Sequence, residues 1–196
     1  HNTKSSSSIC RNSGGYNSNT NTFVAWNWLA GNSSGSSNGD GSITSTVSAN
    51  TTAGFSVVSY TGTGSAATIG HGLGSAPLIT LIKQYSSGGT GSGNWNFITY
   101  QIDGSSDELT LNGDGAKADR SITAPTSSVF SVDTSDERND SGQSYICYCF
   151  AEVKGFSKFG KYNGNGNADG TFVYTGFKPA FLIVKISSGQ NEWTMR

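Results

Sequence analysis

Residues 54–83 read GFSVVSYTGTGSAATIGHGLGSAPLITLIK, and this stretch has a counterpart later in the chain. Residues 155–185 read GFSKFGKYNGNGNADGTFVYTGFKPAFLIVK. From Tyr60 to Lys83 the second stretch follows the first at a constant offset of 102, without a gap. Seven of these 24 positions are identical: Tyr60/Tyr162, Gly62/Gly164, Gly64/Gly166, Ala66/Ala168, Gly74/Gly176, Pro77/Pro179 and Lys83/Lys185. The sequence therefore predicts an internal repeat, and the repeat governs how the remaining segments are interpreted.

The similarity continues on both sides of the aligned stretch. Trp95 in GNWNFI corresponds to Trp193 in NEWTMR, and residues 23–28 (FVAWNW) resemble residues 145–150 (YICYCF). We therefore expect three parts: residues 1–54 as the end of a preceding repeat with a flexible polar loop at 31–42, residues 55–154 as one complete repeat of about 100 residues, and residues 155–196 as the start of a following repeat. This division predicts that the chain is a fragment of a longer polypeptide.

The composition is typical of extracellular β proteins. Apolar residues make up 34% and charged residues 13% of the chain, against about 45–50% and about 25% in ordinary globular domains. Disordered chains are usually highly charged and poor in aromatic residues, whereas this chain has 27 glycines and 11% aromatic residues. The net charge of −1 gives no basic patch for nucleic acid, and no apolar run approaches the length of a membrane span.

Short alternating or apolar segments separated by Gly-rich turns predict an all-β fold. Residues 145–151 have apolar, aromatic and cysteine residues on both faces, which predicts a central strand. Spacings of roughly 8–16 residues favour an antiparallel β-sandwich over parallel βαβ units. The other predicted strands are residues 23–29, 43–49 (as an edge strand), 55–60, 66–69, 78–83, 94–102, 109–112 and 129–133.

No residue pattern in the chain indicates a catalytic, cofactor or metal site. His71, in Gly70-His-Gly72, is expected in a loop or on the surface, because Val173 takes its place in the second copy. The acidic pairs Asp107/Glu108 and Asp136/Glu137 are expected to be surface charges in loops. Asp40, Asp114 and Asp169 precede glycines; we interpret them as turn formers, with calcium binding as the alternative. Cys10, Cys147 and Cys149 form no metal or disulfide pattern and are expected to act as small apolar residues.

Aromatic residues are the candidates for ligand contact. Trp95, Tyr100 and Trp193 could stack on sugar rings, because aromatic faces suit the apolar faces of amphipathic partners. Trp95 and Trp193 recur at the same place in the two copies, which also fits a shared role in the core. Both interpretations stay open at this point.

Two segments resemble a repeat family of marine bacteriophages, including cyanophages, whose members are described as virion or tail-fibre-like structural proteins. Their motifs are AGFS..SYTGTG..AT.GHGLG.AP and CFAEV.G.SKFG.Y.GNG..DGPF.YTGF.P, and Thr171 stands where the second motif has proline. The similarity covers roughly residues 23–196. The family often sits beside a concanavalin-like lectin module, and its repeats have no established catalytic residues.

The resemblance implies a non-enzymatic structural protein on the exterior of a virion, as a tail fibre, spike or other appendage. It would act as a spacer and bind host-surface glycan, without cofactors, nucleic acid or membrane insertion. Expected partners are other virion proteins and further copies of itself, in a trimer if it is a fibre. The alternatives are a secreted bacterial adhesin or lectin-like domain, and a non-catalytic part of a polysaccharide depolymerase.

Overall fold

The computed structural model describes residue 22, residues 27–31 and residues 34–196, and it has an all-β fold with a large antiparallel sheet. The predicted strand at 23–29 falls mainly outside these residues. Among those described, residues 27–29 are not in a strand. The strands are β1 (Ser36–Asn38), β2 (Ser45–Asn50), β3 (Phe55–Thr61), β4 (Ala67–Gly70), β5 (Ile79–Gln84), β6 (Asn96–Thr99), β7 (Ser106–Thr110), β8 (Ala118–Arg120), β9 (Val129–Val132), β10 (Ser144–Phe150), β11 (Ile183–Val184) and β12 (Thr194–Met195).

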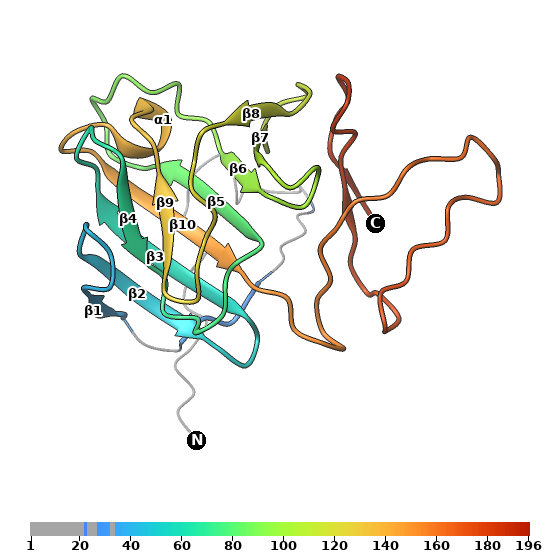
Figure 1. Cartoon of the computed structure of the whole chain (residues 1–196), viewed down its shortest axis with the longest axis horizontal. Coiled ribbons are helices and arrows are strands. Elements are labelled where there is room, and N and C mark those ends of the chain that lie inside the picture. The colour runs from blue at the N-terminus through green and yellow to red at the C-terminus, as the bar shows by residue number, and fades with distance from the viewer. Residues whose placement is uncertain (1–21, 23–26, 32–33) are drawn as a thin grey trace.

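Eight strands form the large sheet in the order β1-β2-β3-β10-β5-β6-β7-β8 (Figure 1). β10 lies between β3 and β5, as its two apolar faces predicted. Along β10 the side chains of Tyr145, Cys147 and Cys149 are buried, and the alternate side chains are half-buried on the other face. The central position of β10 thus brings together strands that lie far apart in the sequence.

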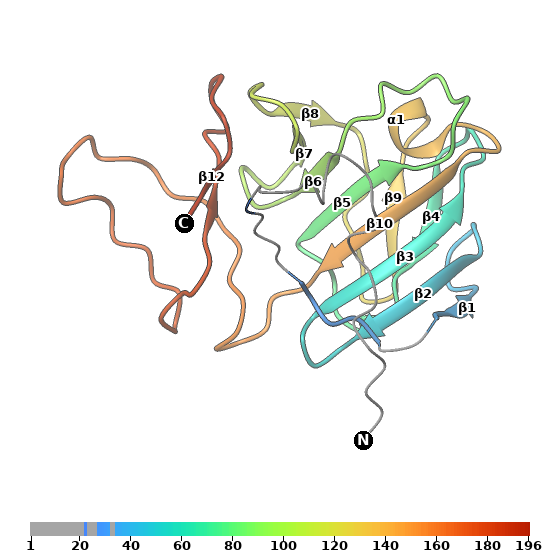
Figure 2. The same cartoon turned by 180° about the vertical axis from the view of Figure 1, so that it is seen from behind.

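A two-stranded sheet of β4 and β9 covers one face of the large sheet and forms the second layer (Figure 1). A parallel bridge between Ile43 and Ile69 joins the layers at one side. Buried residues of both layers form one apolar core: Val58, Tyr60, Ile82, Tyr145, Cys147 and Cys149 from the large sheet, with Ile69, Phe130 and Val132 from the small one. Figure 2 shows the opposite, outer face of the large sheet.

Two segments differ from the sequence-based expectation. The polar loop expected at 31–42 contains β1, which pairs with β2, so β2 is not an edge strand. The polar turn after β9 contains the short helix α1 (Asp136–Asn139), capped by the hydroxyl of Ser135. Because the helix is a single turn, no apolar periodicity in the sequence could indicate it. No helix among the described residues is long and apolar enough to cross a membrane.

The C-terminal segment, residues 155–196, extends away from the two layers (Figure 1). Its regular structure is the hairpin β11–β12, which lies beside the β6–β8 end of the large sheet (Figures 1 and 2). Ser187 O accepts a hydrogen bond from Lys117 N at 2.8 Å, and Asn191 N donates one to Asp114 O at 2.8 Å. Since β1 and β2 share a sheet with strands of residues 55–154, the division of the chain into repeats stays a prediction.

Candidate functional site

Aromatic side chains gather on the outer face of the large sheet. Phe55 and Phe150 pack with ring centroids 5.0 Å apart, and Phe55 stacks on Tyr148 at 6.2 Å. Tyr148 also stacks on Trp95 at 5.9 Å with an interplanar angle of 21°. Tyr148 and Phe150 alternate with buried residues along β10, so the pleat directs them outward. Phe55 pairs with Phe150 across the strands but is only 5% exposed, because its ring is packed against neighbouring aromatic rings. We call Phe55, Trp95, Phe97, Tyr148 and Phe150 the aromatic face.

Trp95 immediately precedes β6, and its ring lies beside Lys83 of β5. The Lys83 ammonium is 5.8 Å from the centre of the Trp95 ring and donates a hydrogen bond to Gly93 O. The backbone N–H of Trp95 donates to Asn112 Oδ1 at 2.8 Å, which fixes the loop that presents the indole. The half-buried indole therefore offers an apolar ring beside a cation and amide groups, a combination suited to a sugar.

Trp193 lies against the same strand as Trp95 but comes from the C-terminal hairpin. Its ring packs on Phe97 of β6 at 5.1 Å, and its Nε1–H donates to Thr110 O at 2.9 Å. Trp193 thus serves as a contact between the hairpin and the large sheet. The structure brings the two predicted tryptophans to the outer side of β6.

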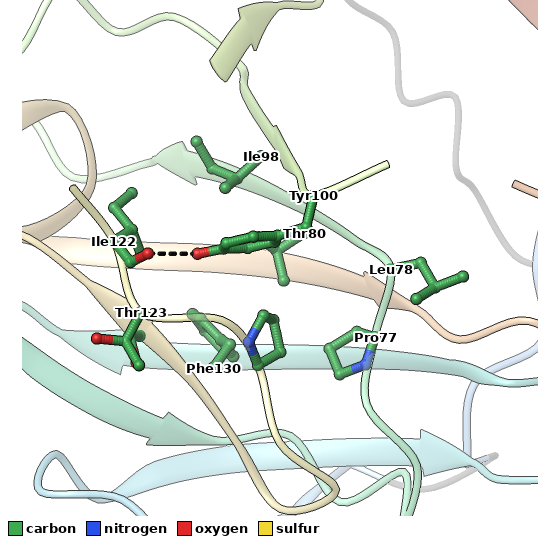
Figure 3. Close-up of a pocket in the computed structure, with 10 residues that line it drawn as sticks. Pro77, Leu78, Thr80, Ile98, Tyr100, Ile122, Thr123 and Phe130 are labelled. Atoms are coloured by element: carbon green, nitrogen blue, oxygen red, sulfur yellow. Dashed lines mark hydrogen bonds between the residues drawn. The ribbon is translucent and has the colours of Figure 1, made fainter. Parts of the chain in front are cut away.

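Tyr100, the third predicted contact residue, is on the inner side. Its hydroxyl donates to Ile122 O at 2.6 Å, and burial raises the pKa of the phenol. Figure 3 shows its ring between the inner side of the large sheet and the segment around Ile122, beside Thr80, Ile98 and Phe130. The space enclosed there is about 10 Å³, roughly one water molecule, so it is not a ligand pocket. Tyr100 is therefore separate from the aromatic face.

A buried charged network lies where α1 meets the edge of the sheet. The guanidinium of Arg138, 2% exposed, contacts Asp133 through Nε–Oδ1 (2.9 Å) and Nη2–Oδ2 (2.8 Å), and Nη1 contacts Glu108 Oε2. Glu108 also pairs with the partly exposed Arg120. Burial alone would lower the pKa of Arg138, but the two carboxylates outweigh it and raise the pKa above its ordinary value. Each charged group in this network has a partner of opposite charge, which is characteristic of a network with a structural role.

Asp107 and Glu108 were expected to be exposed loop charges, and this expectation is wrong. Both are buried on strand β7 and, as neighbours in a strand, point to opposite faces. Asp107 Oδ1 lies 2.6 Å from the ammonium of Lys117, which also contacts Asp103 at 2.6 Å and Asp119 at 2.5 Å. The pairing of β7 with β8 places Asp107 opposite Asp119. Because the two residues are well separated in the sequence, local patterns did not indicate that they lie close together.

Among the described residues, those three aspartates form a group whose oxygens could surround a cation. Lys117 already supplies the positive charge, and Asp103 foremost raises the pKa of the lysine. Burial raises the pKa of Asp107, whose second carboxylate oxygen has no hydrogen-bond partner in the described part of the chain. The aspartates of the Gly-containing turns, Asp40, Asp114 and Asp169, are exposed and belong to no such group. Asp40 forms hydrogen bonds with Asn38, as a turn former does.

His71 lies in a loop as expected but is fully buried, which corrects its expected surface position. Its Nε2 lies 3.2 Å from Thr126 O, and its Nδ1 accepts a hydrogen bond from Leu73 N at 3.2 Å. Burial lowers the pKa of the imidazole. Cys147 and Cys149 are free and buried, with their sulfurs 3.6 Å apart, in agreement with the apolar role expected for them. Cys10 lies outside the described residues.

Comparison with known families places the chain in one of them. The model of a domain of unknown function, DUF7483, matches residues 3–196. The chain belongs to the DUF7483 family. It matches no curated protein and no solved structure. In this chain, the candidate surface for ligand contact is the aromatic face.

Proposed function

We propose that this chain is a structural and adhesive module of a bacteriophage exterior appendage, such as a tail fibre or spike, and that it contacts host-surface glycan through the aromatic face. The observation that carries the proposal is the stacked pair Trp95 and Tyr148 on the outer side of the sheet, with Lys83 beside the indole. The resemblance of the sequence to phage virion repeats supports the same function.

The chemistry of the face suits a weak, repeated contact. The apolar C–H face of a pyranose would lie on the Trp95 ring, while the Lys83 ammonium beside it would donate to its hydroxyl groups. One such contact is expected to be weak because a single stacked ring contributes only about 0.5–1.5 kcal/mol beyond the area it buries. Several copies on one appendage would raise the overall affinity by about 10²–10⁴-fold through effective concentration. The cross-strand hydrogen bonds of the large sheet would keep the rings in place.

Binding is tested with the purified chain on immobilised polysaccharides of the host surface. The Trp95→Ala variant is expected to lose at least about tenfold in affinity, the loss of one good stacking contact. Tyr174→Ala is the matched control, because Tyr174 is an exposed aromatic residue of the C-terminal segment and lies in none of the aromatic-face contacts. Equal binding by wild type, Trp95→Ala and Tyr174→Ala would contradict a glycan site on this face.

Location is tested separately by electron microscopy of particles labelled with an antibody against the chain, together with mass spectrometry of purified particles. Label on tails or fibres would support the appendage. Peptides found on bacterial surfaces or in the medium, and absent from particles, would contradict the virion location and favour a secreted adhesin. The two experiments separate the glycan contact from the place where the protein acts.

A further inference from the structure

The C-terminal hairpin repeats the strand register of β5 and β6. In β5–β6, Leu81 pairs with Phe97 and Ile82 with Asn96. In β11–β12, Ile183 pairs with Met195 and Val184 with Thr194. Ile183 of β11 lies 102 positions after Leu81 of β5, and Met195 of β12 lies 98 positions after Phe97 of β6. These are the offsets that separate Lys83 from Lys185 and Trp95 from Trp193 in the sequence. The hairpin is thus the counterpart of β5–β6 in pairing as well as in sequence.

The two hairpins differ at their second edge. β5 pairs with β6 on one side and with β10 on the other, where Leu81 faces Tyr148. Among the described residues, β11 pairs with β12 alone. Leu182 exchanges both backbone hydrogen bonds with Arg196, so the alternation of an antiparallel ladder directs the N–H of Ile183 toward the other edge. That edge is where a counterpart of β10 would lie.

Side chains of residues 155–196 are also more exposed than their counterparts in the complete sheet. Tyr60 stacks on Tyr145 of β10, donates to Arg138 O of α1 and is 4% exposed, whereas its counterpart Tyr162 is 50% exposed. Thr80 is 5% exposed, and its counterpart Leu182 is 48% exposed. Other large apolar residues of residues 155–196 are also exposed, among them Phe172, Tyr174, Ile183 and Ile186. Exposed apolar residues at an open strand edge, here Leu182 and Ile183, are characteristic of a surface that binds another strand.

We propose that residues 155–196 are an acceptor for an added β-strand, which pairs with the open edge of β11 and has the residue pattern of β10. The pattern follows from the complete sheet. Small apolar residues at the positions of Cys147 and Cys149 face the inner layer, and Ile or aromatic residues at the positions of Ile146 and Tyr148 face outward. The added strand would run antiparallel to β11 and cover Leu182 and Ile183.

The probe is a labelled peptide of residues 142–150 with both cysteines replaced by alanine, GQSYIAYAF. Its binding to the whole chain is measured by fluorescence anisotropy. Backbone amide exchange is expected to slow at Ile183 when the peptide binds, because that N–H gains a hydrogen bond. A peptide of the same composition in scrambled order is expected not to bind. If the scrambled peptide also slowed amide exchange at Ile183, recognition of the β10 pattern would be contradicted.

The decisive variant is Ile183→Pro, which removes the N–H at the open edge and leaves the bonds between Leu182 and Arg196 in place. We expect about tenfold weaker peptide binding, since an edge hydrogen bond is lost and the ring blocks close pairing. Ile183→Thr keeps the N–H and should bind within about twofold of wild type. The indole N–H signal of Trp193 checks that the hairpin remains folded.

Three results would overturn the proposal. The first is no peptide binding to the wild-type chain. The second is equal binding to wild type and Ile183→Pro. The third is self-association of the chain that Ile183→Pro abolishes while the peptide fails to bind, which would identify a second copy, and not a β10-type strand, as the occupant of the edge.

Discussion

Arg138 and Asp133 form a two-pronged ion pair in which Nε and Nη2 of the arginine lie 2.9 and 2.8 Å from the two carboxylate oxygens. The arginine is buried and also contacts Glu108, a residue of β7 located 30 positions earlier. Arg138 thereby joins α1 and the turn before it to β7 of the large sheet. Removal of the arginine would leave the partly buried Asp133 without its ion-pair partner and Glu108 with Arg120 alone.

We therefore expect Arg138→Met to lower the free energy of unfolding by about 3–5 kcal/mol, the usual cost of breaking a buried ion pair. Arg120→Met is the matched control, because Arg120 pairs with the same Glu108 but is 39% exposed, and it should cost less than about 1 kcal/mol. Urea denaturation followed by tryptophan fluorescence measures both values. An equal decrease in unfolding free energy in the two variants would contradict the prediction that the buried ion pair contributes more to stability than the exposed one.

His71 predicts a pH dependence of stability. Its folded pKa is lowered by burial, and protonation of Nδ1 would break the hydrogen bond from Leu73 N. The unfolded chain then binds the proton more readily, so the contribution of His71 is complete above about pH 6.5 and declines as the pH falls toward the folded pKa. We expect the unfolding free energy to decrease between pH 7 and pH 5.

The His71→Asn variant tests this assignment, because it cannot titrate. Its stability should be lower than that of wild type at pH 7 but nearly constant down to pH 5. His1 is the other histidine in the chain. A decline in the variant as steep as in wild type would mean that groups other than His71 cause it.

Gly62 and its counterpart Gly164 give a direct comparison of the two copies. A Cβ atom at Gly62 would lie 2.3 Å from Asp140 O, whereas one at Gly164 would meet nothing within 4 Å. We expect Gly62→Ala to lower the unfolding free energy by about 1–3 kcal/mol through overpacking, and Gly164→Ala to change it by less than about 0.5 kcal/mol. Thermal unfolding of both variants measures the difference, and a similar loss in each would contradict the close approach at Gly62.

Lys117 fills the centre of the group formed by Asp103, Asp107 and Asp119. The Lys117→Gln variant would leave three carboxylates around an empty centre, which suits a hard divalent cation. We expect this variant to bind Ca²⁺ with a dissociation constant of about 10⁻⁴–10⁻³ M, and wild type not to bind it. Titration calorimetry measures both. Lys117→Gln combined with Asp119→Asn should bind more weakly; undiminished binding would place the ion elsewhere.

Much of the sheet could be predicted from local patterns. Alternation along residues 55–60 and 129–133, and the two-sided apolar character of residues 145–151, predicted β3, β9 and the central β10. The register of the hairpin β11–β12 is offset from that of β5–β6 by the same numbers of residues as the two similar sequence segments, and the repeat of about 100 residues stays a prediction. Each of these signals lies within a few neighbouring residues, where the period of side chains along a strand is visible.

The missed features depend on distant pairing. β1 and β8 are short and polar, and each forms a strand because a longer neighbour offers it an edge. Nothing near Arg138 in the sequence indicates that Glu108 will be its partner, and nothing near Asp107 indicates Lys117 as a buried counter-charge. Trp95 and Tyr148 likewise stack because β10 inserts beside β5.

Local residue patterns therefore predicted the all-β class, most of the strands, the central place of β10 and the similarity of residues 54–83 to residues 155–185. The tertiary structure decided which charges are buried, that Tyr100 points inward while Trp95 lies on the outer face, and that β11 has an open edge. The physical reason is that periodicity in one strand reports which residues share a face. The layer that covers that face, and the strand that fills its edge, come from residues far away in the chain.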